Sequence, residues 1–218
     1  MSEKRFTLGI DYGTGSVRSV IFDLTDGSEV ASNVFEYPHG EEGVLTSDAD
    51  PLVARQHPAD YIEGLFRTVS RAVADGRSNG FDPSLLAGIG VDATSSTPIP
   101  VDAKGNALAL APEYDSDLAA MAWLWKDHSS WREADKINQY GRPLHLLDRC
   151  GGTASSEWYW AKILHCTKEA PDVFASAFSW VELADYIPGV LTGNLDPMTM
   201  ARGICGAGHK AIYDERWG

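Results

Sequence analysis

The stretch GIDYGTGSVRSVIFD, residues 9–23, decides the fold. An apolar run that starts at Phe6 leads into Asp11, and a second run with Val17 and Phe22 follows the small-residue turn at 13–15. Branched and aromatic side chains favour strands, and glycine permits tight turns. We therefore expect two antiparallel strands joined by a tight hairpin.

The same turn has residues suited to phosphate oxygens and a metal ion. Backbone N–H groups in a tight turn can point into one concavity, where hydroxyl groups and an arginine would add further donors. A strand-end aspartate can hold Mg²⁺ directly or through water. The candidate phosphate and Mg²⁺ residues are Asp11, Gly13, Thr14, Gly15, Ser16 and Arg18. Spacing alone also permits an ordinary hairpin, because short glycine motifs are common.

Working outward, the turn signal Thr25-Asp26-Gly27 predicts a third antiparallel strand over 30–37. Residues 40–50 lack periodicity and predict an exposed loop. Apolar residues at steps of three and four from Pro58 predict a helix that stops near Gly76. Its expected apolar face comprises Tyr61, Ile62, Leu65, Phe66, Val69, Ala72 and Val73.

The second half of the chain predicts further elements. The apolar run over 85–91 is typical of a strand covered on both faces, and a strand end with a turn follows at 101–106. Helices are expected at 115–127, 156–167 and 181–191, the last one kinked or shortened by Pro188. Antiparallel strands followed by alternating helices and strands indicate an α/β domain with a mixed sheet.

Composition excludes several classes of protein. The 218 residues are 44% hydrophobic and 22% charged, which is typical of a soluble globular protein rather than a disordered or fibrous one. A net charge of -13 without a basic cluster argues against binding to nucleic acid or anionic membranes. The chain also lacks an apolar run long enough to span a membrane and an amino-terminal signal core, so we expect a cytoplasmic protein.

The cysteines and histidines show no metal-binding pattern. Cys150, Cys166 and Cys205 are odd in number and lack the short paired spacing of zinc or redox sites. We expect reduced, mostly buried thiols. The six histidines form no pair at metal-ligand spacing, so the only metal expected is Mg²⁺ bound with a nucleotide.

A loop rich in hydroxyl groups follows the apolar run that ends near Val91. In VDATSSTP, residues 91–98, the side chains of Thr94, Ser95 and Ser96 can donate and accept hydrogen bonds at short range. A polyol would be recognised by such satisfied hydrogen bonds. On the sequence pattern alone, an ordinary strand-end turn is the favoured explanation of the same residues.

Several stretches resemble one family. GIDYGTGSVRSVIFD is similar to the first phosphate motif of the FGGY carbohydrate kinases, a branch of the actin-like ATPase superfamily. Four further regions resemble the ribulokinase group of that family: GVDATSSTPIPVD at 90–102, LWKDH at 124–128, GGTASSEWYWAKILHC at 151–166, and SWVELADYIPGVLTG at 179–193 with RGICGAGHKAIY at 202–213. The resemblance implies a ribonuclease H-like domain of the actin/hexokinase type, with a mixed central sheet flanked by helices. It also implies ATP-dependent phosphorylation of a ketopentose such as ribulose, with ATP and Mg²⁺.

The resemblance assigns sugar-binding positions to this sequence. It places Ser95 in the sugar site, Trp125 as an aromatic wall with Asp127 beside it, Glu157 as an acceptor for hydroxyl groups, and Lys210 near the substrate. The expected substrate-binding set is therefore Thr94, Ser95, Ser96, Trp125, Asp127, Glu157 and Lys210. Ordinary explanations remain: tryptophans pack in cores, an exposed lysine is solvated, and a glutamate in the first turn of a helix is favoured by the helix dipole.

The resemblance also implies what this sequence lacks. Residues 1–218 correspond to the amino-terminal domain with the sugar site and phosphate hairpin, whereas the ATP-binding lobe and the general-base aspartate are expected beyond Gly218. We therefore expect the chain to be inactive alone, and the complete protein to form a homo-oligomer. One alternative is a stand-alone sugar or nucleotide binding module without kinase activity. Another, an actin- or chaperone-like ATPase, needs a second phosphate motif that the sequence does not show.

Overall fold

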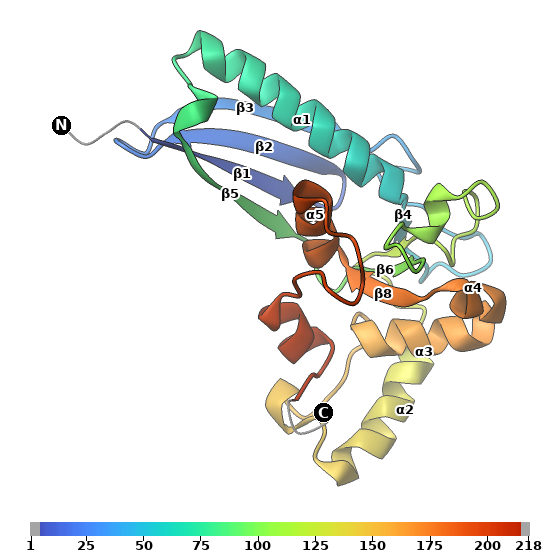
Figure 1. The fold of residues 1–218 in the computed structure, drawn as a ribbon. Helices are drawn as coiled ribbons and strands as arrows, with labels where there is room; N and C mark the ends of the chain where they lie inside the picture. The colour runs from blue at the N-terminus through green and yellow to red at the C-terminus, as the bar shows by residue number, and fades with distance from the viewer. Residues whose placement is uncertain (1–4, 215–218) are drawn as a thin grey trace. The chain divides into compact units, whose positions relative to one another are not determined.

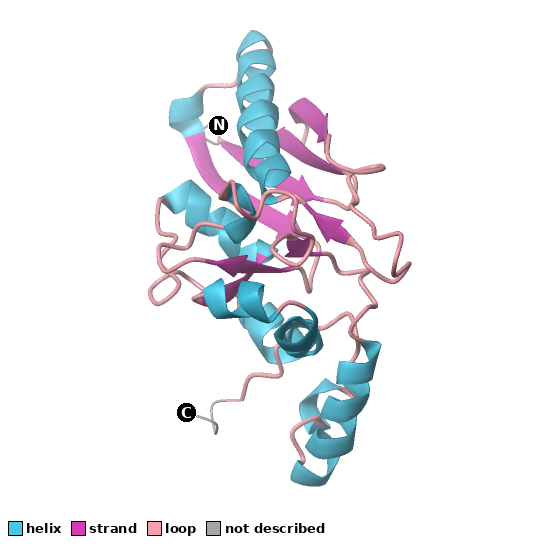
Figure 2. Ribbon diagram, turned by 90° about the vertical axis from the view of Figure 1, so that its right-hand side faces the viewer, coloured by secondary structure: helices cyan, strands magenta, loops and turns pink. Residues whose placement is uncertain are grey.

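The computed structural model describes residues 5–214 and divides the chain into two compact units. Of the described residues, unit 1 contains 5–43 and 59–93, and unit 2 contains 44–58 and 94–214. Helices and strands occur in both units (Figure 1; Figure 2). The protein is a mixed α/β structure, as the sequence predicts.

Unit 1 is built on a four-stranded mixed sheet. Strands β1 (Phe6–Tyr12), β2 (Ser16–Asp23) and β3 (Glu29–Glu36) are antiparallel neighbours, and β5 (Leu86–Ala93) runs parallel to β1, in the order β3-β2-β1-β5. Every second side chain of β1 is buried, which fits a strand with one face on a core. The predicted hairpin and third strand are confirmed.

Helix α1 (Pro58–Ser78) covers one face of this sheet (Figure 1). The helix approaches so closely at Gly64 that an added Cβ would lie 2.3 Å from Cγ1 of Val17. Beside it, the hydroxyl groups of Thr68 and Ser19 lie 2.7 Å apart in the buried interface. The buried stripe of α1 therefore includes small and polar residues as well as large apolar ones.

This stripe corrects one predicted core residue. Phe66 is 63% exposed, although it had been assigned to the apolar face of the helix. The prediction was wrong because it left out glycine and polar residues, whereas Gly64 and Thr68 are buried on the side that faces the sheet. The helix also continues to Ser78, past the expected stop.

Strand β5 differs from its prediction as well. It is the outermost strand of the sheet, and Ile89 is 48% exposed, so the expectation of a strand covered on both faces is wrong. The apolar run contains Gly88 and Gly90, beside which an added Cβ would meet no atom within 4 Å. Glycine raises the apolar count of a run without supplying a side chain to bury.

Unit 2 contains two short antiparallel sheets and four α-helices. Strand β4 (Arg55–Gln56) pairs with β7 (Ala122–Trp123), and β6 (Pro98–Val101) pairs with β8 (Ser179–Glu182). The helices are α2 (Trp131–Gly141), α3 (Tyr159–Glu169), α4 (Pro171–Ser176) and α5 (Leu183–Thr192). Single helical turns occur at η1 (Pro83–Leu85) in unit 1, and at η2 (Leu108–Leu110), η3 (Arg142–Leu144), η4 (Asp148–Cys150) and η5 (Gly206–Lys210) in unit 2.

The predicted helix at 115–127 is absent from the described structure. Turns occupy its first half, where the Asp117 carboxylate accepts a hydrogen bond from the backbone N–H of Ala119, and β7 occupies part of the second half. Aspartate competes with helical hydrogen bonds in this way. The periodic spacing of Leu118, Met121 and Trp125 was therefore misleading.

The other predicted helices are confirmed with shifted limits. Helix α3 starts at Tyr159 rather than at 156, which leaves Glu157 in the turn before the helix. Helix α5 follows β8 and contains Pro188, yet it continues to Thr192. The prediction of an exposed loop at 40–50 is wrong for Val44, which is 6% exposed. Helices α2 and α4 were not predicted.

One core cluster of unit 2 consists of buried, mostly apolar side chains. Its members are Leu108, Ala109, Ala120, Met121, Trp123, Ile163, Cys166, Val173 and Trp180. Cys150 and Cys166 are buried free thiols, as expected, whereas Cys205 is free and exposed. Burial raises the pKa of the Cys166 thiol to about 11. Within residues 5–214, no helix combines the length and apolarity that a membrane span requires.

Candidate functional site

The hairpin of unit 1 is shaped by its two glycines. The N–H of Gly13 donates to the carbonyl oxygen of Ser16 at 2.9 Å, which closes the turn. An added Cβ at Gly13 would lie 3.0 Å from Nη2 of Arg18, and one at Gly15 would lie 3.0 Å from the carbonyl oxygen of Glu42. The backbone oxygen leaves little room for a side chain at Gly15, whereas at Gly13 the flexible end of Arg18 can move and the fixed neighbour is the carbonyl oxygen of Ser16 at 3.3 Å.

Asp11 and Arg18 lie opposite each other on the two strands of this hairpin. Oδ2 of Asp11 lies 2.6 Å from Nη2 of Arg18, and the two side chains are 48% and 54% exposed. Both line an open hollow of about 630 Å³ on the sheet, together with Gly9 and Asp92. Thr14 and Ser16 are partly exposed in the same hairpin. The six predicted phosphate residues thus lie together, although the N–H of Gly13 is used within the turn.

The hairpin fits a metal ion that is shared with phosphate. Mg²⁺ is usually bound by one or two carboxylates together with phosphate oxygens and water. Asp11 supplies one half-exposed carboxylate, and Arg18 occupies one of its oxygens. In the part of the chain that the structure describes, no group of three or more His, Cys, Asp or Glu side chains could hold a metal ion by itself.

From Thr94 onward the hydroxyl-rich loop belongs to unit 2, and it divides into exposed and buried parts. Thr94 and Ser95 are partly exposed, and the hydroxyl of Thr94 lies 3.0 Å from that of Thr97. Ser96 is 1% exposed, and its hydroxyl donates to the Glu182 carboxylate. The other carboxylate oxygen accepts the backbone N–H of Thr97 at 2.8 Å. The hydroxyl of Ser96 is therefore used inside the protein.

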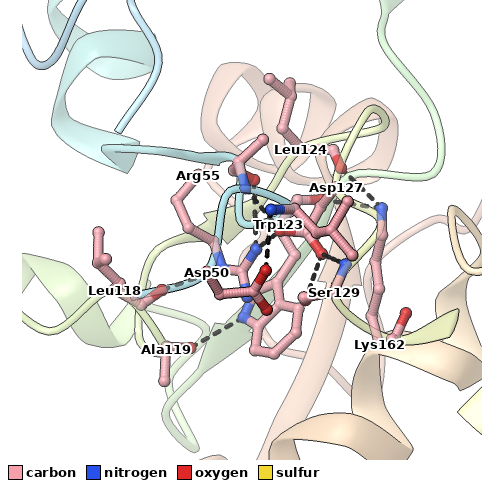
Figure 3. A network of polar contacts seen from close by, with 12 residues as sticks. Asp50, Arg55, Leu118, Ala119, Trp123, Leu124, Asp127, Ser129 and Lys162 are labelled. Atoms are coloured by element: carbon pink, nitrogen blue, oxygen red, sulfur yellow. Dashed lines mark hydrogen bonds and ion pairs between the residues drawn. The ribbon is translucent and has the colours of Figure 1, made fainter. Parts of the chain in front are cut away.

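A fully buried lysine lies behind the same loop. Nζ of Lys162 donates to the carbonyl oxygens of Leu124 at 2.8 Å and Trp123 at 3.3 Å (Figure 3). It also donates to the carbonyl oxygen of Ser96 at 2.7 Å. Burial lowers the pKa of Lys162 well below its usual range, although the nearby Glu182 opposes this shift. Burial likewise raises the pKa of Glu182, against the effect of its hydrogen bonds. Three carbonyl oxygens satisfy the three donors of the ammonium group.

Asp127 is also an interior residue. It is fully buried and forms an ion pair with Arg55, and its carboxylate accepts the N–H of Ala54 at 2.7 Å and the hydroxyl of Ser129 at 2.6 Å (Figure 3). The Arg55 guanidinium lies 3.5 Å from the centre of the Trp123 ring, and burial lowers its pKa to about 9. The carboxylate oxygens of Asp127 are therefore used to hold the surrounding backbone in place. Trp125, two residues earlier in the chain, has a 38% exposed side chain.

Glu157 lies in the turn before α3, and Lys210 lies beside this turn. Oε1 of Glu157 is 3.7 Å from Nε2 of His128, and the Glu157 side chain is 35% exposed. Nζ of Lys210 lies 5.6 Å from the ring centre of Trp158, the residue after Glu157. An acceptor and a cation thus flank this turn, where both are accessible to a polar ligand.

Sequence reasoning did not identify Arg55, Lys162 or Glu182. A usable signal was present for two of them, because Lys162 interrupts an otherwise apolar helix segment, YWAKIL, and Glu182 interrupts WVEL. Lysine and glutamate are almost never fully buried unless they are paired. Their partners are mainly a serine and backbone groups, which the sequence does not reveal.

Comparison with known proteins identifies the relatives of the chain. The model of the FGGY family of carbohydrate kinases, N-terminal domain, matches residues 6–203. Ribulokinase from Vibrio parahaemolyticus is 39% identical over 220 residues, which cover 100% of this chain and 38% of the relative. Ribulokinase from Geobacillus thermodenitrificans is 38% identical over 221 residues, covering 99% of this chain and 38% of the relative. The chain thus spans well under half the length of these relatives.

Solved structures show the same fold at low sequence identity. Xylulose kinase from Bifidobacterium adolescentis has a TM-score of 0.70 and 15% identity, over 97% of this chain and 40% of the other. Xylulose kinase from Rhodospirillum rubrum has a TM-score of 0.68 and 19% identity, over 85% and 34%. These structures support the predicted actin/hexokinase-type fold.

Proposed function

Because the chain belongs to the FGGY family of carbohydrate kinases, we propose that it is the amino-terminal domain of an ATP-dependent kinase that phosphorylates a ketopentose such as ribulose. The observation that carries this proposal is the 39% identity to a ribulokinase along the whole chain. The ATP-binding lobe and the general base are proposed to lie outside these 218 residues. No comparison favours a stand-alone binding module.

In this proposal the exposed polar groups of unit 2 bind the sugar. Ser95 and Thr94 offer hydroxyl groups, Glu157 accepts hydrogen bonds from sugar hydroxyls, and Lys210 donates to a sugar oxygen. The exposed part of Trp125 covers the carbon face of the sugar. A sugar that lacks one of these hydroxyl groups would leave a polar partner unsatisfied, which is the basis of selectivity.

Ser96 and Asp127 have an indirect part in the proposal. Both are buried and hydrogen-bonded within the protein, so they fix the chain next to Ser95 and Trp125 rather than bind the sugar themselves. Buried polar groups that are fully satisfied make a local structure rigid.

The hairpin is proposed to receive the phosphate groups of ATP with Mg²⁺. Thr14 and Ser16 supply hydroxyl donors and Arg18 a permanent cation, while Asp11 takes part in holding the metal ion. When bound, Mg²⁺ neutralises charge that develops on the phosphate oxygens. We further propose that the complete protein is a cytoplasmic homo-oligomer that does not bind nucleic acid or membranes.

Calorimetric titration of the chain with ribulose tests the sugar site, with glycerol as the control ligand. We expect ribulose to bind more tightly than glycerol, and the variant Glu157→Gln to weaken ribulose binding about tenfold because a charged acceptor is lost. Absence of ribulose binding, or unchanged binding in the variant, would contradict the proposed site.

An assay of ADP formation tests whether the ATP-binding site and the general base lie outside these 218 residues, as proposed. The 218-residue chain should show no ribulose-dependent ATP consumption, because the adenosine site is proposed to lie elsewhere. Addition of the remaining domain of a homologous ribulokinase should restore turnover. Robust turnover by the chain alone would show that the proposed domain assignment is wrong.

A further inference from the structure

Two buried charges in unit 2 have no role in the proposed chemistry. Lys162 on α3 is 0% exposed, and Glu182 at the end of β8 is 5% exposed. Burying a charge is strongly unfavourable unless it is paired and hydrogen-bonded. An apolar side chain of similar length would fill the position of Lys162 without the cost of desolvating a charge. The hydrogen-bond partners of Lys162 therefore indicate what its charge does.

The partners of both charges belong to the segments that are proposed to contact the sugar. Glu182 holds the hydroxyl of Ser96 and the N–H of Thr97, while Lys162 holds the carbonyl oxygen of Ser96. Ser96 is thereby fixed through its side chain and its backbone by opposite charges, and the partly exposed Ser95 directly precedes it.

The same ammonium group also fixes a second segment. Lys162 accepts no hydrogen bonds, and its two remaining donors go to the carbonyl oxygens of Trp123 and Leu124, immediately before Trp125. One side chain therefore joins the hydroxyl-rich loop to the segment that carries the aromatic wall. A change in the position of one segment would break a hydrogen bond to the ammonium group that also holds the other.

We propose that Lys162 and Glu182 are positioning residues that hold the Ser95 loop and the Trp125 segment in the arrangement required for sugar binding. This inference rests on the proposed function, since it takes ribulose as the ligand of the site. Neither side chain touches the sugar. Their effect is to remove the conformational freedom that the two segments would otherwise lose on binding, and such preorganisation strengthens binding.

The variant Lys162→Met tests the proposal, with Lys168→Met as the matched control. Both lysines are on α3, but Nζ of Lys168 donates at 2.5 Å to the carboxylate of Glu133 on α2. We expect Lys162→Met to weaken ribulose binding about tenfold by calorimetry. It should also speed amide hydrogen exchange about tenfold at 94–97 and 123–126, relative to exchange in α3. Lys168→Met should change neither quantity.

Glu182→Gln provides a second variant in case Lys162→Met does not fold. The amide keeps an oxygen acceptor but loses the charge and one of the two acceptors for Ser96 and Thr97, so exchange should quicken at 94–97 and ribulose binding should weaken. If a folded variant at either position binds ribulose like the unmodified chain and retains slow exchange, the proposal is overturned.

The two readouts separate this proposal from the proposed function. If the unmodified chain binds no ribulose but Lys162→Met still loosens both segments, the sugar assignment fails and the positioning of the segments is supported. If the unmodified chain binds ribulose and the variants bind it equally well, the sugar assignment stands and the positioning role fails. If Lys168→Met weakens ribulose binding as much as Lys162→Met does, the loss comes from a general decrease in stability, and the positioning proposal is overturned.

Discussion

Different interactions stabilise two regions of the molecule, the α1-covered sheet of unit 1 and the 123–129 segment of unit 2. The sheet depends on apolar side chains at alternate positions and on the close approach of α1 at Gly64. The segment has little regular secondary structure and depends on buried charges, with Lys162 at one end and Arg55 at the Asp127 end. The sheet of unit 1 should therefore be sensitive to substitutions that add volume to its interface with α1. The 123–129 segment should be sensitive to substitutions that remove one partner of a buried charge.

The largest expected effect is the loss of one partner of the buried pair in unit 2. Asp127→Ala leaves the Arg55 guanidinium buried without its carboxylate, which should lower the free energy of unfolding by about 3–5 kcal/mol. Urea unfolding measures the change. In the double variant Arg55→Met/Asp127→Leu, part of this loss should be recovered because neither charge of this pair remains buried. A single variant that loses less than the double variant would contradict this account.

The next effect tests packing in unit 1. Gly64→Ala introduces a Cβ 2.3 Å from Cγ1 of Val17, so we expect a loss of about 1–3 kcal/mol of stability from overpacking. The helix propensity of alanine acts in the opposite direction by about 1 kcal/mol. Gly88→Ala on β5 is the control, because no atom lies within 4 Å of the added Cβ. A stabilising Gly64→Ala would show that α1 is not closely packed there.

A pH-dependent effect is expected at Glu133 between α2 and α3. Burial raises the pKa of this carboxyl, but hydrogen bonds from Lys168 and His165 outweigh it, so the folded pKa lies below the usual 4.5. The stabilisation is therefore present above pH 4.5 and is lost as the pH falls through the lower folded pKa. Lys168 is partly exposed, which limits the expected loss to about 1 kcal/mol.

Glu133→Gln provides the measurement for that pair. Urea unfolding of the variant should show a smaller loss of stability between pH 5 and about pH 3 than the unmodified chain shows. An identical acid dependence in both proteins would mean that Glu133 does not contribute to it.

The smallest effect is expected at the exposed ion pair of the hairpin. Arg18→Gln should change the free energy of unfolding by less than about 1 kcal/mol, because both side chains of the Asp11–Arg18 pair are about half exposed. Thermal unfolding measures it, with Asp127→Ala as the buried comparison. A loss as large as that of Asp127→Ala would remove the distinction between exposed and buried charges in this protein.

The sequence predicted the parts of the fold that follow from periodicity. Alternating burial in β1, the hairpin at 13–15 and the long helix from Pro58 are local consequences of residue type. The burial of Phe66 was predicted wrongly because a pattern of apolar residues does not show where a helix approaches a sheet closely at a glycine. The position of β5 was predicted wrongly because the pattern does not show which strand lies at the edge of the sheet. The helix expected at 115–127 failed because side chain to backbone hydrogen bonds of Asp117 competed with helical ones.

For the candidate site, the sequence supplied the exposed residues better than the buried ones. Ser95, Trp125 and Glu157 were predicted from their chemical type and from the resemblance, and all three are at least partly exposed. Lys162 was not found, since the groups that stabilise it are backbone carbonyls present at every residue. The interruption of the apolar segment YWAKIL marks Lys162 as unusual, but its role depends on three-dimensional packing that the sequence does not reveal.

The three free thiols differ in their expected reactivity, so one of them can be labelled selectively. Cys205 is exposed and lies immediately before the η5 turn that carries Lys210, whereas burial raises the pKa of both Cys150 and Cys166 and keeps them protonated. Since the thiolate is the reactive form, a maleimide dye should attach at Cys205 first. An optical reporter can therefore be installed five residues from a proposed ligand-binding lysine without altering the sequence.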